Sequence, residues 1–286
     1  MSTGRRGDLR VHTVAAILCG PLGCGRSWIC KALLLVAVLA LTLLTQIGGV
    51  ALWLACGLGG RIPRWRAAAT LTAFVLLYAT LTLFVVPGIA PVFGRVPLAC
   101  FAGEHAYAAQ SPIYCALNRH YVRPPLRMFV AGLADHMAAT HPGTVVTYLD
   151  GNFPFGDGFP LLPHLSHDDG SKVDIALFYE GRPRGGAWFA GYWAFAPAQR
   201  FEVAPACAKD GLLRWKMAAI QGSFASLRLD KARTTAMLSR IVDEKRIGQV
   251  FVEPYLLPVL GVGSTKIGFA GCAAARHDDH IHIALQ

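Results

Sequence analysis

The chain is short of charge, and of negative charge in particular. Only 15% of its 286 residues are charged, and 17 acidic residues face 27 basic ones. A net charge of +10 on its own would suit a nucleic-acid partner. However, the sequence has no Lys/Arg run and no recognised nucleic-acid-binding motif, and five basic residues lie within the first 31. We therefore predict that nucleic acid is not a partner.

The eight cysteines contain no C-x-x-C pair, which argues against a thiolate zinc knuckle or a redox motif. Four of them lie beyond the long apolar runs, namely Cys100, Cys115, Cys207 and Cys272. An even number of cysteines in an exported domain permits two disulfides. From proximity we expect Cys100 to pair with Cys115 and Cys207 to pair with Cys272.

Two long stretches near the N-terminus have no charged residue. Ala32–Cys56 and Ala67–Phe93 are uncharged over 25 and 27 residues. About 20 apolar residues can cross a bilayer, so we predict two transmembrane helices joined by the short loop Gly57–Arg66. Residues 1–31 would then form a tail, residues 32–93 the membrane part, and residues 94–286 one domain large enough for its own core.

The basic residues support two opposite orientations of these helices in the membrane. The basic residues before the first helix would place the N-terminus in the cytoplasm, and with it the domain. Three arginines in the short loop would instead place the loop in the cytoplasm and the domain outside. We follow the density of charge in the loop, which predicts an inner-membrane protein with its domain on the periplasmic side.

Beyond residue 93 the patterns alternate between strands and helices. Apolar residues at helical spacing predict helices over Pro125–Thr140 and over Leu229–Lys245, the second with Asp230 as its N-cap. Runs rich in β-branched residues predict four strands: Val145–Leu149, Val173–Tyr179, Gln249–Val252 and His280–Leu285. We expect an α+β fold, with a small, mainly antiparallel sheet, flanking helices on one side, and two transmembrane helices before it.

Two histidine-rich stretches lie far apart in the chain. The first, P-H-L-S-H-D-D-G-S-K-V-D, and the second, H-D-D-H-I-H, offer six side chains: His164, His167, Asp174, His277, His280 and His282. Neutral imidazoles and carboxylates hold zinc in a tetrahedron, and a catalytic site leaves one corner open. Residues two apart on a strand point to the same face. The residues two positions after Asp174 and His282 are small, which leaves room for a metal on that face. The pattern therefore predicts a metal between two strands.

Two plainer interpretations compete with a metal site. A single histidine on an apolar face is more often a satisfied core or surface residue. A histidine-rich tail can also be an adventitious metal binder or a tag. The clustering of five histidines in two short stretches argues against the first, and the acidic residues and strand pattern of the second stretch argue against a tag.

The spacing H-x-x-H-x-x-G-x-x-x-D-I, followed late in the chain by H-D-D-H-I-H-I, resembles the penicillin-insensitive murein endopeptidase family. That family belongs to the lysostaphin-type, D-Ala-D-Ala and hedgehog-like zinc folds, and the stretch Arg246–Leu256 also resembles it. The resemblance covers roughly residues 100–286 and implies that His167, Asp174 and His282 bind Zn²⁺. It implies further that three more histidines line the site: His164, His277 and His280.

The same resemblance implies a membrane-anchored zinc peptidase that cuts D-Ala–meso-diaminopimelate crosslinks between peptidoglycan peptides. A D,D-carboxypeptidase of the same fold is one alternative, and a zinc-containing cell-wall binding protein without catalysis is another. Many members of the wider group have a Glu near the final His ligand, and this motif has none. His280, His277 and Asp279 are the candidates for a general base, and His280 is preferred because it shares the strand face of His282.

Overall fold

The computed structural model describes residues 28–59, 61–186, 189–192, 227–272, 274 and 276–286. It divides into two compact units, Met1–Ile89 and Ala90–Gln286, which are described separately. The fold is α+β, with a two-stranded antiparallel sheet and a six-stranded mixed sheet in the second unit.

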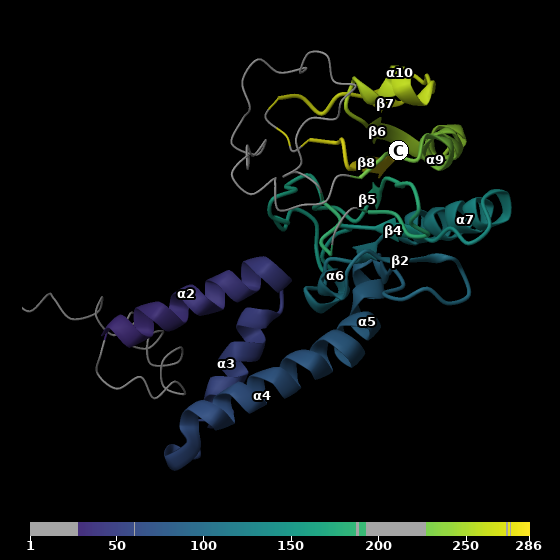
Figure 1. The fold of residues 1–286 in the computed structure, drawn as a ribbon. Coiled ribbons are helices and arrows are strands. Elements are labelled where there is room, and N and C mark those ends of the chain that lie inside the picture. Colours follow the sequence, from purple (N-terminus) through teal and green to yellow (C-terminus); the bar gives the residue numbers. More distant parts are fainter. Residues whose placement is uncertain (1–27, 60, 187–188, 193–226, 273, 275) are drawn as a thin grey trace, which may run out of the picture. The chain divides into compact units, whose positions relative to one another are not determined.

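The first apolar run is not one helix, so the prediction of a continuous helix over Ala32–Cys56 is wrong. It is divided into α2 (Trp28–Thr45) and α3 (Gly48–Gly59) (Figure 1). Gln46 has φ of 65°, and a residue in the left-handed region ends a helix. The Thr45 hydroxyl accepts a hydrogen bond from the Gly48 N–H at 2.8 Å, which supplies a partner to a backbone group at the start of α3.

The second apolar run is helical throughout. It consists of α4 (Arg66–Thr80), the π-helical turn η3 (Leu81–Val85), α5 (Val86–Ile89) and the 3₁₀ turn η4 (Ala90–Phe93). By length and composition, Trp28–Thr45 and Arg66–Phe93 are the two described segments able to cross a membrane. With 12 residues, α3 is about 18 Å long, well short of the roughly 30 Å hydrocarbon core.

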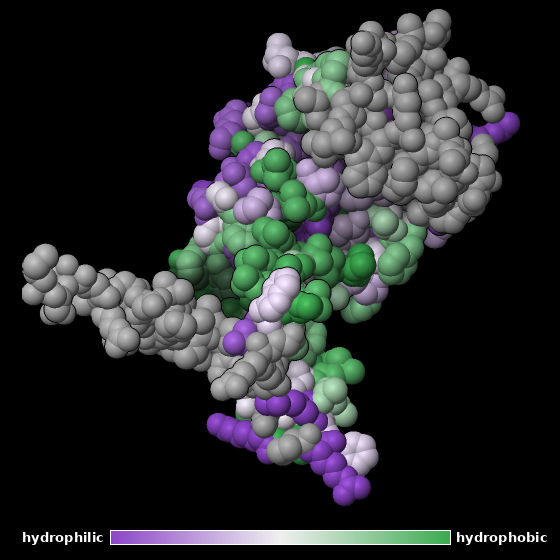
Figure 2. Space-filling model, turned by 90° about the vertical axis from the view of Figure 1, so that its left-hand side faces the viewer, coloured by the Kyte–Doolittle hydropathy of each residue, from purple (hydrophilic) through white to green (hydrophobic). Residues whose placement is uncertain are grey.

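The connection between α3 and α4 is basic. It includes a 3₁₀ turn, η2 (Pro63–Trp65), and both Arg61 and Arg64 are exposed there. Figure 2 shows hydrophilic residues gathered at this end of the helices (purple, at the bottom). Exposed apolar side chains cover the helices themselves, among them Leu33, Val36, Leu71 and Leu83.

The large sheet of the second unit has the strand order β2-β4-β5-β8-β6-β7. Its strands are β2 (Tyr107–Ala109), β4 (Val146–Tyr148), β5 (Lys172–Ala176), β6 (Ile247–Phe251), β7 (Ile267–Gly268) and β8 (His280–Leu285). The central pairs are antiparallel, whereas both edge pairs, β2/β4 and β6/β7, are parallel. The large sheet is therefore mixed, with three antiparallel pairs and two parallel ones. Separately, β1 (Val96–Pro97) pairs with β3 (Tyr121–Val122).

Helices cover the apolar face of this sheet. α7 (Pro124–Thr140) and α9 (Lys231–Asp243) contact each other and lie on the same side of the strands (Figure 1). Two shorter helices, α6 (Pro112–Ala116) and α10 (Leu256–Leu260), complete the described set. The predicted apolar stripe of α7 is wholly buried, namely Leu126, Phe129, Val130, Leu133 and Met137. The helix and its core-facing stripe are thus confirmed.

A disulfide joins Cys100 to Cys115, as predicted. The other predicted pair includes Cys207, which lies outside the described residues.

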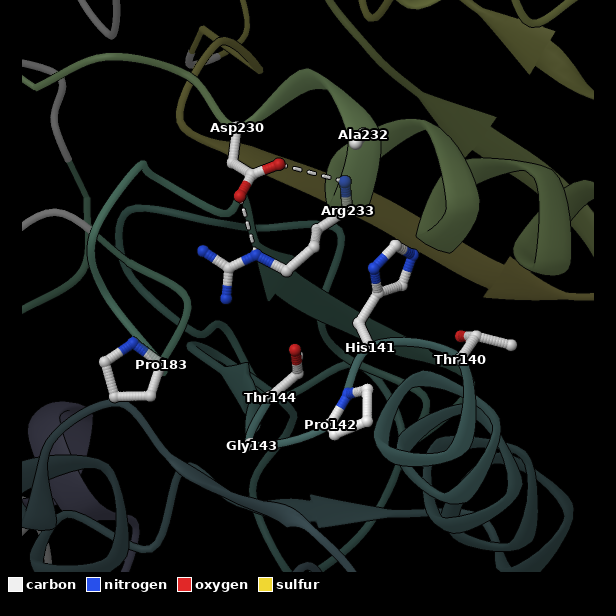
Figure 3. Close-up of a pocket in the computed structure, with 9 residues that line it drawn as sticks. All are labelled: Thr140, His141, Pro142, Gly143, Thr144, Pro183, Asp230, Ala232 and Arg233. Atoms are coloured by element: carbon white, nitrogen blue, oxygen red, sulfur yellow. Dashed lines mark hydrogen bonds and ion pairs between the residues drawn. The ribbon is translucent and has the colours of Figure 1, made fainter.

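The start of α9 provides a test of local stability. Asp230 accepts a hydrogen bond from the Arg233 backbone N–H at 3.0 Å and another from Arg233 Nε at 2.8 Å. Figure 3 shows the Asp230 carboxylate in a pocket that shares no residue with the two histidine-rich stretches. We expect Asp230→Ala to lower the free energy of unfolding by about 1 kcal/mol, the usual contribution of an N-cap.

Thermal unfolding followed by circular dichroism would measure this change. Asp230→Asn is the matched control, because its side-chain oxygen still accepts from the Arg233 N–H while its charge is gone. A loss in Asp230→Asn as large as in Asp230→Ala would assign the effect to the ion pair and contradict the capping role.

Candidate metal centre

Neighbouring strands bring the two predicted motifs together. β5 and β8 are antiparallel partners, with Asp174 directly opposite His282 and Ala176 opposite His280. All four side chains therefore lie on one face of the sheet. The alternate residues, such as Ile281, point to the opposite face and are buried in the core. The two-residue periodicity of each strand thus places the polar site residues on one face of the sheet and the core-packing residues on the other.

The loop between β4 and β5 delivers His164 and His167 to this face. Its shape is held by Arg95, whose side chain is only 1% exposed. The Arg95 guanidinium pairs with the Asp157 carboxylate at 2.7 Å and donates to three backbone carbonyls of the loop, those of Phe153, Gly156 and Asp168. A buried cation bound to several carbonyls fixes a segment that has little regular structure of its own.

Three donor atoms converge in a compact triangle. His167 Nε2 lies 3.0 Å from His282 Nδ1 and 3.3 Å from Asp174 Oδ1. His282 Nδ1 lies 3.0 Å from Asp174 Oδ1. All three residues are buried, with exposures of 0%, 0% and 3% for His167, Asp174 and His282. The structure therefore places together the three residues for which the sequence predicts metal binding.

A contact outside the triangle sets the tautomer of His167. Its Nδ1 lies 2.7 Å from the Gly151 carbonyl oxygen, which can only accept, so Nδ1 carries the proton. In the neutral ring Nε2 then presents a lone pair to Asp174 Oδ1 and His282 Nδ1. With the His282 proton on Nε2, three lone pairs converge in this buried space, and a cation stabilises such an arrangement. An imidazole oriented in this way by a backbone carbonyl is typical of a metal ligand.

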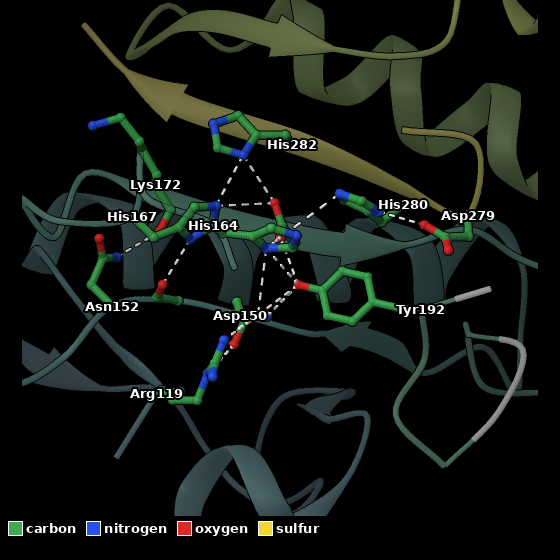
Figure 4. A network of polar contacts seen from close by, with 12 residues as sticks. Arg119, Asp150, Asn152, His164, His167, Lys172, Tyr192, Asp279, His280 and His282 are labelled. Atoms are coloured by element: carbon green, nitrogen blue, oxygen red, sulfur yellow. Dashed lines mark hydrogen bonds and ion pairs between the residues drawn. The ribbon is translucent and has the colours of Figure 1, made fainter. Parts of the chain in front are cut away.

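The other oxygen of Asp174 belongs to a second group of polar atoms, which includes Asp150, His164 and Tyr192 (these three are labelled in Figure 4). The Tyr192 hydroxyl lies 2.7 Å from Asp174 Oδ2 and 2.9 Å from Asp150 Oδ2. His164 Nδ1 lies 3.0 Å from Asp174 Oδ2 and 3.1 Å from the Tyr192 hydroxyl. Asp174 thus connects two clusters, one through each carboxylate oxygen.

Buried charge is partly balanced within this second group. Arg119 Nε and Nη2 donate to the two oxygens of Asp150 at 2.5 Å and 2.8 Å. Burial raises the pKa of Asp150, but the Arg119 charge and the contacts with His164 outweigh it and lower the value to about 2. Burial would lower the pKa of His164, whereas Asp174 and Asp150 raise it to about 10.

The remaining histidines differ in their surroundings. Burial lowers the pKa of His282 to about 4, which keeps this ring neutral and able to bind a metal. His280 Nδ1 lies 2.5 Å from Asp279 Oδ1, while His280 Nε2 is buried and has no hydrogen-bond partner. His277 is placed by its backbone, because its N–H donates to Glu253 Oε1 at 3.1 Å. Its ring centroid lies 4.8 Å from that of His280.

These side chains could hold a metal ion. Ligand atoms of His164, His167 and Asp174 lie within 4.8 Å of one another, but the triangle that includes His282 is tighter. The chain matches no family model, and no curated protein matches it.

Three residues of the site were not predicted from the sequence, namely Arg119, Asp150 and Tyr192. Asp150 closely follows β4 at the start of the Gly/Pro/Phe loop, a position that often carries function. Tyr192 follows a stretch rich in Gly and Arg, and Arg119 precedes β3. None of them belongs to a spacing motif, so no pattern connects them before the fold is known.

Proposed function

We propose that the chain is a membrane-anchored zinc metallopeptidase that hydrolyses crosslinks between peptidoglycan peptides. The substrate and the bond, D-Ala–meso-diaminopimelate, rest on the family resemblance of the two histidine motifs. The two apolar segments support a membrane location, and the density of arginine in the loop between them is the reason to place the second unit on the periplasmic side. A net charge of +10 favours encounter with an anionic envelope polymer.

The observation that carries this proposal is the triangle of His167 Nε2, Asp174 Oδ1 and His282 Nδ1. Ligands at about 2.0–2.1 Å from a tetrahedral zinc ion stand about 3.3–3.4 Å apart, and the three edges measure 3.0–3.3 Å. Two nitrogens and one carboxylate oxygen are also a donor set that zinc prefers. Bound there, zinc would lower the pKa of a coordinated water to about 7 and polarise the scissile carbonyl.

His280 would act as the general base. Its hydrogen bond with Asp279 places the proton on Nδ1, so Nε2 is free to accept one, as in other carboxylate–histidine pairs. Nε2 lies 3.8 Å from Asp174 Oδ2, and so faces the metal ligands. The same nitrogen can then deliver the proton to the leaving amine. His277 and His164, whose ring centroids lie 4.8 Å and 5.9 Å from that of His280, would line the site and orient the substrate.

Incubation of the zinc-loaded full chain, in detergent, with purified crosslinked muropeptide dimers tests the proposal. We expect mass spectrometry to show two monomers from each dimer, with activity lost on chelation and restored by zinc. Release of D-Ala alone from pentapeptides would indicate a D,D-carboxypeptidase instead. A zinc-loaded chain that binds dimers without cleaving them would be a cell-wall binding protein and would overturn the proposed activity.

A further inference from the structure

We propose that Asp174 bridges two metal ions and that Asp150, His164 and Tyr192 form the second site. The first ion would lie at Asp174 Oδ1, in the site of the proposed function, on which this inference rests. The second would lie at Asp174 Oδ2.

The donor atoms of the second site stand at the separations that a small ion requires. Taking Asp174 Oδ2, Asp150 Oδ2, His164 Nδ1 and the Tyr192 hydroxyl, five of the six pairs are recorded. They measure 2.7, 2.9, 3.0, 3.1 and 3.4 Å. The ligands of a tetrahedral zinc ion stand about 3.3–3.4 Å apart, so only small movements are needed. One nitrogen and three oxygens suit zinc and harder divalent ions alike.

Without a metal, the charge of this group is balanced through protons. The Tyr192 hydroxyl has one proton, yet it faces the oxygens of two carboxylates at 2.7 Å and 2.9 Å. Arg119 neutralises Asp150, and a protonated His164, 3.0 Å from Asp174 Oδ2, would neutralise Asp174. A divalent ion at Asp174 Oδ2 would take the place of that proton, with neutral His164 as its ligand.

Residues around the second site hold its ligands in position. Arg119 holds the Asp150 carboxylate through both of its oxygens, as outer groups commonly hold metal-binding carboxylates. The Arg119 charge also makes Asp150 a weaker ligand, so the second ion should bind less tightly than the first. His280 Nε2, without a partner and 3.8 Å from Asp174 Oδ2, lies beside both positions.

A second ion would change the chemistry that the site offers. Two-metal hydrolases hold their ions about 3.5–4 Å apart, where one stabilises the attacking oxygen and the other the leaving group. A single carboxylate that binds through both oxygens is compatible with this spacing. The proposed substrate is a peptide, and a second ion would give its scissile group two electrophilic contacts instead of one.

Metal titration of the metal-free full chain in detergent tests this inference. Elemental analysis after equilibration with Zn²⁺ should give two ions per wild-type chain and one in Asp150→Asn. Because that variant leaves Arg119 buried without a counterion, Tyr192→Phe provides a gentler change and should weaken only the second ion, by about tenfold or more. Tyr107→Phe is the matched control, since Tyr107 is also buried but contacts neither carboxylate.

Electron paramagnetic resonance of the Co²⁺ form separates adjacent ions from ions on exposed histidines. We expect the signal of the first equivalent to weaken through magnetic coupling as the second binds. One ion per saturated chain, or two ions without coupling and insensitive to Asp150→Asn, would overturn the second site. One ion with dimer cleavage would reject only this inference, whereas two coupled ions without cleavage would reject only the proposed peptidase.

Discussion

Asp174→Asn is expected to abolish tight metal binding. The substitution keeps the size of a residue that is 0% exposed, but it removes the negative charge that faces His167 and His282. Loss of a hydrogen-bonding group outside the ligand set already costs 10- to 100-fold in metal affinity, so loss of this ligand should exceed about 100-fold. Elemental analysis of the dialysed, full-length variant measures the effect.

Asp168→Ala is the control for this experiment. Asp168 lies in the same loop, its side chain is 39% exposed, and it does not contact the donor triangle. We expect its metal content to equal that of the wild type. A tightly bound ion that persists in Asp174→Asn, with circular dichroism unchanged, would show that Asp174 is not a ligand and that the donor triangle is not the metal site.

His280→Ala is expected to retain its zinc and lose about 10²-fold or more in turnover of crosslinked muropeptides. The reason is that Nε2 is a buried nitrogen without a hydrogen-bond partner that can accept a proton beside the proposed metal ligands, and general bases contribute about 10²–10⁴-fold. Steady-state kinetics should show the loss in kcat and little change in KM, because the ring is assigned to proton transfer.

Two further variants test whether His280 is the general base. Asp279→Asn should give a smaller loss in kcat, because it weakens the hydrogen bond that orients the ring without removing the base. His136→Ala changes an exposed histidine of α7 and should leave kcat unaltered. Near-normal turnover in zinc-loaded His280→Ala would move the role of base to His277 or Asp279.

Much of the site was predictable because its residues follow strand periodicity. His280 and His282 alternate with buried isoleucines, and Asp174 lies in a run of β-branched residues. The sequence therefore indicates which face of each strand carries the site residues. What periodicity does not give is the pairing of β5 with β8, which decides that Asp174 meets His282. Arg119 and Tyr192 reach the site from segments without a repeating pattern, and only the fold brings them there.

The fold departs from prediction where elements are short or composition is uniform. β2 and β7 have three and two residues, too few for alternation to be visible, and they turn an antiparallel sheet into a mixed one. The break at Gln46 lies within an apolar run, and hydropathy is the same on both sides of it. The pair Gly48–Gly49 was the available signal, because glycine weakens a helix interior.

The pairing of Asp174 with His282 also couples metal affinity to folding of the whole second unit. These residues are separated by 108 positions, and closing a flexible loop of that length costs about 4 kcal/mol in chain entropy. The donor triangle is therefore absent from the unfolded chain, and the proposed zinc ion would bind only to folded molecules. Any distant change that destabilises the unit should weaken apparent zinc affinity once the unfolded population is appreciable. Conversely, zinc should slow unfolding by holding the two central strands together.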